Sequence, residues 1–373
     1  MNHKQNYQLG SFGYDINRLQ AIEGLDILQS GSSMVAVSGI YQGRIFTSSA
    51  RGRAGKSYGW VNWELINKGT HATEMVALGG ESRLWFAPEW GKFSLCFEAG
   101  KEHIDANLRR PIDSNRKQFN TTKKTPTSLT CEGNLQLIND QNFAFDIHTA
   151  RTIAILNKED IEKKLSISIP DPVPFVGFTA ETTVKNISAQ PFKKESGLIA
   201  IWELGCQLTT PDTVVILPLR QPTDRITEYF GVLEDRLTIK DQVVYYQADA
   251  LAIGKIGILP RHCKNVMGSY SPSQQLLTIV TFSFENDPIY VNSVPHNTTP
   301  YQGDVINIFN GVVDENLNLP FYEFESSSSA KELQPSEQMY HRQTTYHFEG
   351  EMDNLNQIAE SVLGISLKQI PAF

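Results

Sequence analysis

The sequence predicts an almost all-β fold in which two large antiparallel sheets pack face to face. Short runs of β-branched and aromatic residues recur along the whole chain, and many of them alternate with polar residues as half-buried strands do. The 26 glycines and 18 prolines punctuate these runs where turns are needed. Helical patterns are too few for alternating strands and helices, which argues against a parallel sheet.

The expected strands follow one another from one end of the chain to the other. Residues 179–185 and 340–348 are the clearest, since they show the alternation of half-exposed strands. The full set covers residues 34–41, 44–48, 84–86, 93–97, 143–156, 176–185, 197–208, 213–217, 243–247, 276–284, 321–325 and 340–348.

A few short helices are expected between the strands. Residues 157–165 have the composition of a surface helix, and residues 61–67 are a further candidate. In residues 353–363 apolar side chains recur on one face, with Asp353 as N-cap and Gly364 as the stop. That face comprises Leu355, Ile358, Ala359, Val362 and Leu363.

All of residues 1–373 are expected to form one domain. Large all-β units exceed the usual domain size. The least regular stretches, residues 106–126 and 326–336, lack the change of composition that marks a linker. No repeat with a fixed period is present, which argues against solenoids and propellers.

The charge and hydropathy of the chain exclude several classes of partner. The formal charge of -8, from 41 acidic and 33 basic residues, repels the phosphate backbone of nucleic acids. No run approaches the roughly 18 apolar residues that cross a bilayer, so no membrane partner is expected. Residues 1–13 lack a secretory signal pattern, which predicts a cytoplasmic chain, or a periplasmic or secreted one if a signal has been removed. The oligomeric state is not predicted.

No metal and no cofactor are expected. Cys96, Cys131, Cys206 and Cys263 lie far apart without the spacing of metal ligands, and the first three lie in or beside apolar runs that predict burial. Residues 52–57 (GRAGKS) lack the glycine spacing of a phosphate-binding loop. No Gly-x-Ser-x-Gly motif and no Cys–His arrangement indicates a nucleophile.

A segment rich in polar and aromatic residues, 58–90, is the first candidate site. Four of the five tryptophans lie between positions 60 and 90. Aromatic faces stack on the C–H faces of sugar rings, while Glu, Arg and Asn side chains bind hydroxyls. The same tryptophans also suit a core around the turn at residues 79–80. The candidate substrate-binding residues of this segment are Trp60, Asn62, Glu81, Arg83, Trp85 and Glu89.

Three basic residues lie inside or next to apolar strands. An unpaired charge is costly there, so Arg44, Arg83 and Lys255 each need a partner. A substrate carboxylate or a neighbouring glutamate meets that need equally well. All three are therefore candidates for substrate binding.

Three segments carry a family resemblance. Residues 79–94 read GGESRLWFAPEWGKFS, residues 197–204 read GLIAIWEL after an Asn-Ile-Ser turn at 186–188, and the tail contains FYEFESS at 321–327 and LQPSE at 333–337. In this order they resemble uncharacterised bacterial proteins grouped with the aldose 1-epimerase (galactose mutarotase) superfamily. The resemblance implies a galactose-mutarotase-like β-supersandwich with a cleft for a mono- or oligosaccharide. It also implies that Arg83 faces this cleft, and Trp202 is a further candidate for substrate binding.

The resemblance implies a catalytic role for two glutamates. Opening and reclosing a pyranose needs a base at the anomeric hydroxyl and an acid at the ring oxygen. In mutarotases a glutamate near the C-terminus is the base, and Glu325 matches it best. Glu323 lies on the same face of the strand, about 7 Å away, where two carboxylates raise each other's pKa or divide the acid and base roles. Without the resemblance, the pair also fits the exposed face of an edge strand.

The acid is missing from the place where the resemblance puts it. Mutarotases carry a His-x-Tyr-Phe-Asn segment after the mid-chain turn, whereas residues 191–196 read PFKKES here. We expect His71, just before the Gly-Gly-Glu segment, in the cleft, with His262 as second choice. His341 and His347 are expected to face solvent or a neighbouring strand.

Three functions are open from the sequence. The first is an epimerase- or mutarotase-type enzyme that acts on a sugar or sugar acid by general acid/base catalysis, with Glu325, Glu323 and His71 as catalytic residues. The second is a sugar-binding protein without catalysis, which the absent histidine favours. The third is a glycoside hydrolase or lyase, or a domain associated with one. Hydrolysis needs two carboxylates roughly 5 to 10 Å apart, which Glu81 or Glu89 facing Glu325 would supply if the fold brings them together.

Overall fold

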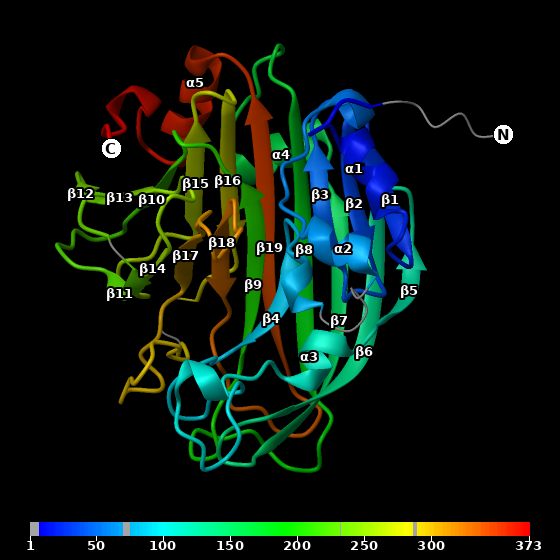
Figure 1. Ribbon diagram of the computed structural model, residues 1–373, viewed down its shortest axis with the longest axis vertical. Coiled ribbons are helices and arrows are strands. Elements are labelled where there is room, and N and C mark those ends of the chain that lie inside the picture. Colours follow the sequence, from blue (N-terminus) through cyan, green and yellow to red (C-terminus); the bar gives the residue numbers. More distant parts are fainter. Residues whose placement is uncertain (1–6, 70–74, 232, 286–288) are drawn as a thin grey trace.

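The computed structural model describes residues 7–69, 75–231, 233–285 and 289–373. Within these residues the strands form three antiparallel sheets, of three, ten and six strands (Figure 1). The small N-terminal sheet lies at one side of the two large ones, and helix α5 (Met352–Val362) lies at the other. The expected all-β class, with large antiparallel sheets and few short helices, is confirmed, and the small sheet is an addition to it.

The small sheet and its helices come from the first part of the chain. Helix α1 (Phe12–Leu19) begins after Ser11, whose hydroxyl accepts a hydrogen bond from the Tyr14 N–H. Helix α2 (Trp63–Lys68) is capped by Asn62 and ends at Gly69. The sheet itself consists of β1 (Leu25–Ser30), β2 (Ser33–Ser38) and β3 (Arg44–Ser49).

The two large sheets contain the remaining strands. Across the ten-stranded sheet these are β12 (Leu237–Lys240), β13 (Val243–Gln247), β10 (Val214–Pro218), β15 (Val266–Ser271), β16 (Leu276–Phe282), β19 (Gln338–Glu349), β8 (Phe175–Asn186), β7 (Ala144–Ile155), β6 (Ser128–Ile138) and β5 (Asn120–Lys124). Across the six-stranded sheet they are β11 (Thr227–Gly231), β14 (Gly254–Ile258), β17 (Ile306–Asn310), β18 (Phe321–Ser327), β9 (Ala200–Leu208) and β4 (Arg83–Ala87).

The remaining helices are short and lie in connections. They are η1 (Gly52–Ala54), η2 (Val76–Leu78), η3 (Asp105–Asn107), α3 (Ile112–Arg116), α4 (Lys158–Leu165) and η4 (Leu367–Gln369). No helix among the described residues is long and apolar enough to cross a membrane.

One face of the six-stranded sheet packs on the ten-stranded sheet. Ile256, Ile308 and Phe324 belong to the same buried cluster as Val215 and Val280 of the opposite sheet. Because successive side chains of a strand point to opposite faces, the residues next to these point away from the core. The outer face of β14, β17 and β18 therefore carries residues of the opposite parity.

The register of the strands aligns these outer residues in two rows. Lys255 pairs with Phe309, which pairs with Glu323, which in turn pairs with Cys206. In the next row Asn307 pairs with Glu325, Glu325 with Leu204, and Leu204 with Arg83. Residues from five parts of the chain thus meet on one face of the sheet.

A buried ion pair joins the two large sheets behind this face. The Arg151 guanidinium of β7 donates to both carboxylate oxygens of Glu203 on β9, at 2.5 and 2.6 Å. It also donates to the hydroxyls of Ser82 and Thr182 at 3.0 and 2.9 Å. A buried charge with this many partners is satisfied, so Arg151 and Glu203 need no ligand.

Most expected elements are present, with shifted ends. The helix expected at 157–165 is α4, and the one expected at 61–67 is α2. The helix expected at 353–363 is α5, but its N-cap is Glu351, not Asp353. Asp353 lies within the first turn, where it forms an ion pair with Lys368 at 2.9 Å.

The expected set of strands was also incomplete. The strands outside it are β1, β5, β6, β11, β12, β14, β15 and β17. The apolar run at 93–97 predicts a strand, but it is a loop. Its Leu95, Cys96 and Phe97 belong to the large buried apolar cluster, so its apolar character reflects burial without a strand. Helix α1 was not expected, although its buried Phe12, Ile16 and Leu19 recur at helical spacing. The expected burial of the cysteines is confirmed.

Candidate functional site

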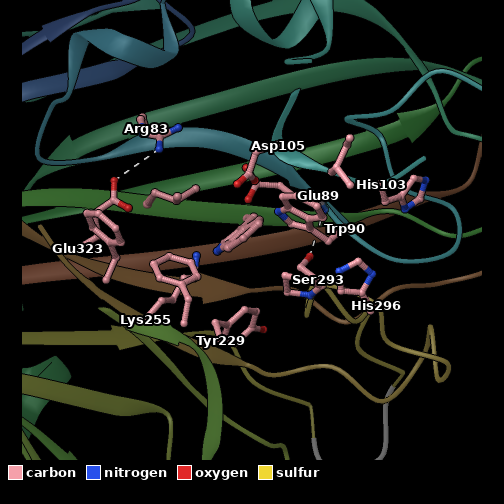
Figure 2. Close-up of a pocket in the computed structure, with 16 residues that line it drawn as sticks. Arg83, Glu89, Trp90, His103, Asp105, Tyr229, Lys255, Ser293, His296 and Glu323 are labelled. Atoms are coloured by element: carbon pink, nitrogen blue, oxygen red, sulfur yellow. Dashed lines mark hydrogen bonds and ion pairs between the residues drawn. The ribbon is translucent and has the colours of Figure 1, made fainter. Parts of the chain in front are cut away.

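The outer face of the six-stranded sheet forms the floor of a cavity of about 670 Å³ (Figure 2). Loops that follow β4 and β16 wall it at one end. The cavity is lined by Arg83, Glu89, Trp90, His103, Ile104, Asp105, Trp202, Leu204, Tyr229, Phe230, Lys255, Ser293, Pro295, His296, Phe309 and Glu323. Of the sequence-predicted site residues, it brings together Glu323, Arg83, Glu89, Lys255 and Trp202.

Lys255 and Glu325 form an ion pair at the floor of the cavity. The Lys255 Nζ atom donates to both carboxylate oxygens of Glu325, at 3.0 and 2.9 Å. Glu325 is fully buried and is not part of the cavity lining, whereas Lys255 is. The Lys255 ammonium lies 4.6 Å from the ring centroid of Trp202 and 5.6 Å from that of Tyr229. Lys255 is thus the charged group of this pair that faces the cavity.

Glu323 faces the cavity and is held by two other side chains. Its Oε1 atom lies 3.4 Å from Arg83 Nη2 and accepts a hydrogen bond from Cys206 Sγ at 3.0 Å. Figure 2 shows the Arg83–Glu323 pair at one end of the cavity. Burial raises the pKa of the Cys206 thiol well above its usual value, and the Glu323 carboxylate raises it further. Cys206 therefore remains a protonated hydrogen-bond donor to Glu323.

Glu89 is held by two hydrogen bonds. Its carboxylate accepts a hydrogen bond from Trp85 Nε1 at 2.8 Å, and its backbone N–H donates to Ser293 Oγ at 3.1 Å. Trp85 itself is buried in the core beside Trp202, its partner across β4 and β9. Trp85 thus orients the Glu89 carboxylate without lining the cavity itself.

The cavity floor contains more carboxylates than cations. Burial raises the pKa of Glu325 to about 7; the Lys255 ammonium opposes this shift, and the Glu323 and Glu89 carboxylates add to it. Burial alone would lower the pKa of Lys255, but the Glu325, Glu89 and Glu323 carboxylates raise it. Both shifts favour the protonated forms, so Lys255 keeps its charge at neutral pH and Glu325 holds its proton more tightly than an exposed glutamate does.

Tyr229 was not foreseen and reaches the cavity through a bulge in β11. The register of β11 against β14 shifts between Glu228 and Phe230, and a bulge turns a side chain from its regular direction. The Tyr229 hydroxyl donates to Asp304 Oδ2 at 3.0 Å, and Thr227 donates to the other oxygen at 2.8 Å. Burial raises the pKa of Asp304 to about 6.

Glu81 and Arg44 lie outside the cavity lining, in the interior. Glu81 Oε1 accepts a hydrogen bond from Ser48 at 2.7 Å and lies 2.6 Å from His347 Nε2. Arg44 donates to the Gly79 carbonyl, and burial together with the Arg83 charge lowers the pKa of Arg44 to about 9. Both side chains have protein partners.

The other candidates serve the fold or lie elsewhere. Trp60 stacks on Phe321 with centroids 4.3 Å apart, and Asn62 caps α2. His71 lies outside the described residues. His262 is held by Arg261, at 2.9 Å.

The two histidines of the last strand are buried. His347 Nδ1 lies 2.9 Å from Thr278 on neighbouring β16, in line with the expected contact to another strand. His341 lies between Ser283 and Ser326, and burial lowers its pKa to about 3, so its ring is neutral.

A metal-ligand cluster is not found in the described part of the chain: no group of three or more His, Cys, Asp or Glu side chains converges there. The histidines of the lining are His103 and His296. His103 Nε2 lies 3.3 Å from Oδ2 of Asp140, a residue that is not part of the lining. Sequence reasoning missed both, because they belong to loops without a periodic pattern.

Comparisons with solved structures identify the fold. A galactose mutarotase-like protein from Lactobacillus casei superposes with a TM-score of 0.50 and 11% identity over 87% of this chain and 99% of that chain. A putative aldose 1-epimerase from Escherichia coli superposes with a TM-score of 0.50 and 10% identity, over 87% of this chain and 98% of that chain. A protein of Synechocystis sp. PCC 6803 superposes with a TM-score of 0.51 and 7% identity, over 88% of this chain and 96% of that chain.

In sequence, no curated protein matches the chain. Residues 10–373 match a family of unknown function, DUF6786. Because the sequence identity to these structures is only 7 to 11%, the matches establish the fold but no function. The chain belongs to the family of unknown function DUF6786, and it has the galactose-mutarotase-like fold.

Proposed function

We propose that this protein binds a sugar in the cavity and interconverts its anomers by general acid/base catalysis. The observation that carries the proposal is that a carboxylate, Glu323, and an ammonium, Lys255, both line the cavity, with the Trp202 ring 4.6 Å from the ammonium. Aromatic faces with a few convergent charged groups are typical of sugar sites.

The roles follow from which groups reach the cavity. Glu323 accepts the proton of the anomeric hydroxyl, the C1–O5 bond breaks, and the electron pair of the O1–H bond forms the aldehyde. The ring oxygen takes a proton from the Lys255 ammonium, because an alkoxide is more basic than an amine. Rotation about C1–C2 and the reverse steps close the other anomer. Glu325 is the counter-charge that orients Lys255.

This assignment supplies an acid in place of the missing family histidine. It differs from the sequence-based assignment, in which Glu325 is the base, because Lys255 separates Glu325 from the cavity. Arg83 and Cys206 orient the Glu323 carboxylate, and Trp202 and Tyr229 supply apolar faces for the ring.

A sugar receptor without turnover is the second candidate. It is favoured by the fact that both β18 carboxylates are already engaged in ion pairs, Glu323 with Arg83 and Glu325 with Lys255. A hydrolase that pairs Glu81 or Glu89 with Glu325 receives no support, because Glu325 is bound to Lys255 and is not part of the cavity lining. The Glu81 carboxylate also lies outside the lining, where it contacts His347.

The test is exchange spectroscopy between anomer signals of a panel of monosaccharides and uronic acids, with saturation transfer on the same samples. We expect accelerated exchange that Glu323→Gln and Lys255→Met reduce at least a hundredfold. The matched control is Glu228→Gln, an exposed carboxylate on β11 that is not part of the lining. Binding without exchange would favour the receptor, and absence of both would refute the proposal.

A further inference from the structure

The cavity has two ends that are built differently. At the inner end the lining residues project from strands, among them Arg83, Trp202, Lys255 and Glu323. At the outer end the lining residues belong to loops after β4 and β16, among them Glu89, Trp90, Asp105 and His296. Figure 2 shows Arg83 and Glu323 toward the left of the view and Trp90 and His296 toward the right.

The two loops of the outer end hold each other in place. Glu89 N–H donates to Ser293 Oγ at 3.1 Å, which joins one loop to the other. Gly91 packs so closely on the Asn297 amide that a Cβ atom would overlap it, and Asn297 Nδ2 donates to the Val294 carbonyl at 2.7 Å. The two loops therefore form an ordered wall at this end of the cavity.

Trp90 is a supported aromatic surface at this end. Its ring lies 4.9 Å from Phe97, and Phe97 stacks on His103 with centroids 4.2 Å apart. His103 in turn lies 3.3 Å from the Asp140 carboxylate. Each contact reduces the freedom of the Trp90 ring, which remains partly exposed.

Polar groups with spare hydrogen-bonding capacity surround Trp90. Among the ion pairs that the described residues form, none involves Glu89, Asp105 or His296. An aromatic face beside carboxylates that accept hydroxyl hydrogens is the same combination that recognises the ring at the inner end.

The size of the cavity suits more than one ring. Small-ligand pockets range from about 300 to about 1,000 Å³. At about 670 Å³ this one exceeds twice the lower limit.

We propose that the outer end is a second sugar subsite, formed by Glu89, Trp90, Asp105 and His296, and that the substrate is the reducing end of an oligosaccharide. The terminal ring, with its free anomeric carbon, lies over Lys255 and Glu323. The next ring stacks on Trp90. This inference rests on the proposed function and specifies its substrate class.

The experiment is calorimetric titration of the intact protein with glucose and galactose, and with the disaccharides maltose, cellobiose and lactose. We expect at least one disaccharide to bind about tenfold more tightly than its reducing-end monosaccharide. Trp90→Ala should remove this gain and leave monosaccharide affinity unchanged. Asp105→Asn is a second, milder variant that should reduce the gain. Trp63→Ala, in α2 away from the lining, should change neither affinity.

The outcomes distinguish failure of the second subsite from failure of the proposed function. If monosaccharides bind but no disaccharide gains affinity, the second subsite is wrong and the proposed function stands. The same holds if Trp90→Ala weakens both classes equally, because Trp90 would then contact the first ring. If neither class binds and no anomer exchange is seen, both the subsite and the function are refuted.

Discussion

The Lys255 ammonium lies within 3.0 Å of both carboxylate oxygens of Glu325, although a whole strand, β17, separates β14 from β18 in the sheet. The long lysine side chain crosses the neighbouring strand and covers the carboxylate. An ionised Glu325 is therefore shielded from the cavity, and the cation is presented in its place.

Removing the cation alone should destabilise the protein more than removing both charges. Lys255→Met leaves Glu325 buried without a partner, and we expect it to lower the free energy of unfolding by about 3 kcal/mol. The double variant Lys255→Met with Glu325→Leu should recover most of this loss, because it buries no charge. Urea unfolding of both variants at neutral pH measures the difference; equal losses would contradict a coupled pair.

Glu325 should make stability depend on pH around neutrality. Because its pKa in the folded protein, about 7, exceeds the ordinary 4.5, the folded state holds this proton more tightly. The resulting contribution, on the order of 3 kcal/mol, is full below pH 4.5 and is lost as the pH rises through about 7. Urea unfolding of the protein and of Glu325→Gln at about pH 5 and about pH 8.5 compares the slopes. An unchanged slope in the variant would assign the effect to other groups.

Cys206 should position Glu323 through its thiol proton. Cys206→Ala removes the donor at 3.0 Å, and we expect kcat for anomer exchange to fall about tenfold with KM nearly unchanged. Cys206→Ser restores a donor and should recover most of the rate. If the serine variant is as slow as the alanine variant while both remain folded, the thiol acts by packing alone.

The contact between the two loops can be tested at Gly91. Gly91 and Gly100 have φ of 78° and 76°, so an alanine is strained equally at both. A Cβ atom at Gly91 would overlap Asn297, whereas nothing lies within 4 Å at Gly100. Gly91→Ala should therefore cost about 1 to 3 kcal/mol more stability than Gly100→Ala, and it should weaken sugar binding. Equal effects on stability and affinity would show that the loops do not depend on this contact.

Local patterns were sufficient for eleven of the nineteen strands that the described residues form, and for part of the site. The alternation along β18 predicts that Glu323 and Glu325 share a face, and they do, because side chains of a strand repeat every second residue. Arg83 and Lys255 were singled out because a cation in an apolar strand needs a partner, and each has a glutamate partner. These inferences depend only on neighbours in sequence.

Which of these residues meet, and which of them face the cavity, depends on the packing of distant segments. Glu81 and Arg83 lie two residues apart, yet the Glu81 carboxylate binds His347 in the interior and Arg83 lines the cavity. Tyr229 enters through a bulge, and Trp90 and His296 come from loops, which carry no periodic signal. The β class and the faces of the predicted strands follow from local side-chain alternation, which can be recognised in the sequence alone. The pairing of Lys255 with Glu325 across β17 depends on the order and register of the strands in the sheet. Order and register are established by contacts between distant segments, so they cannot be inferred from neighbours in sequence.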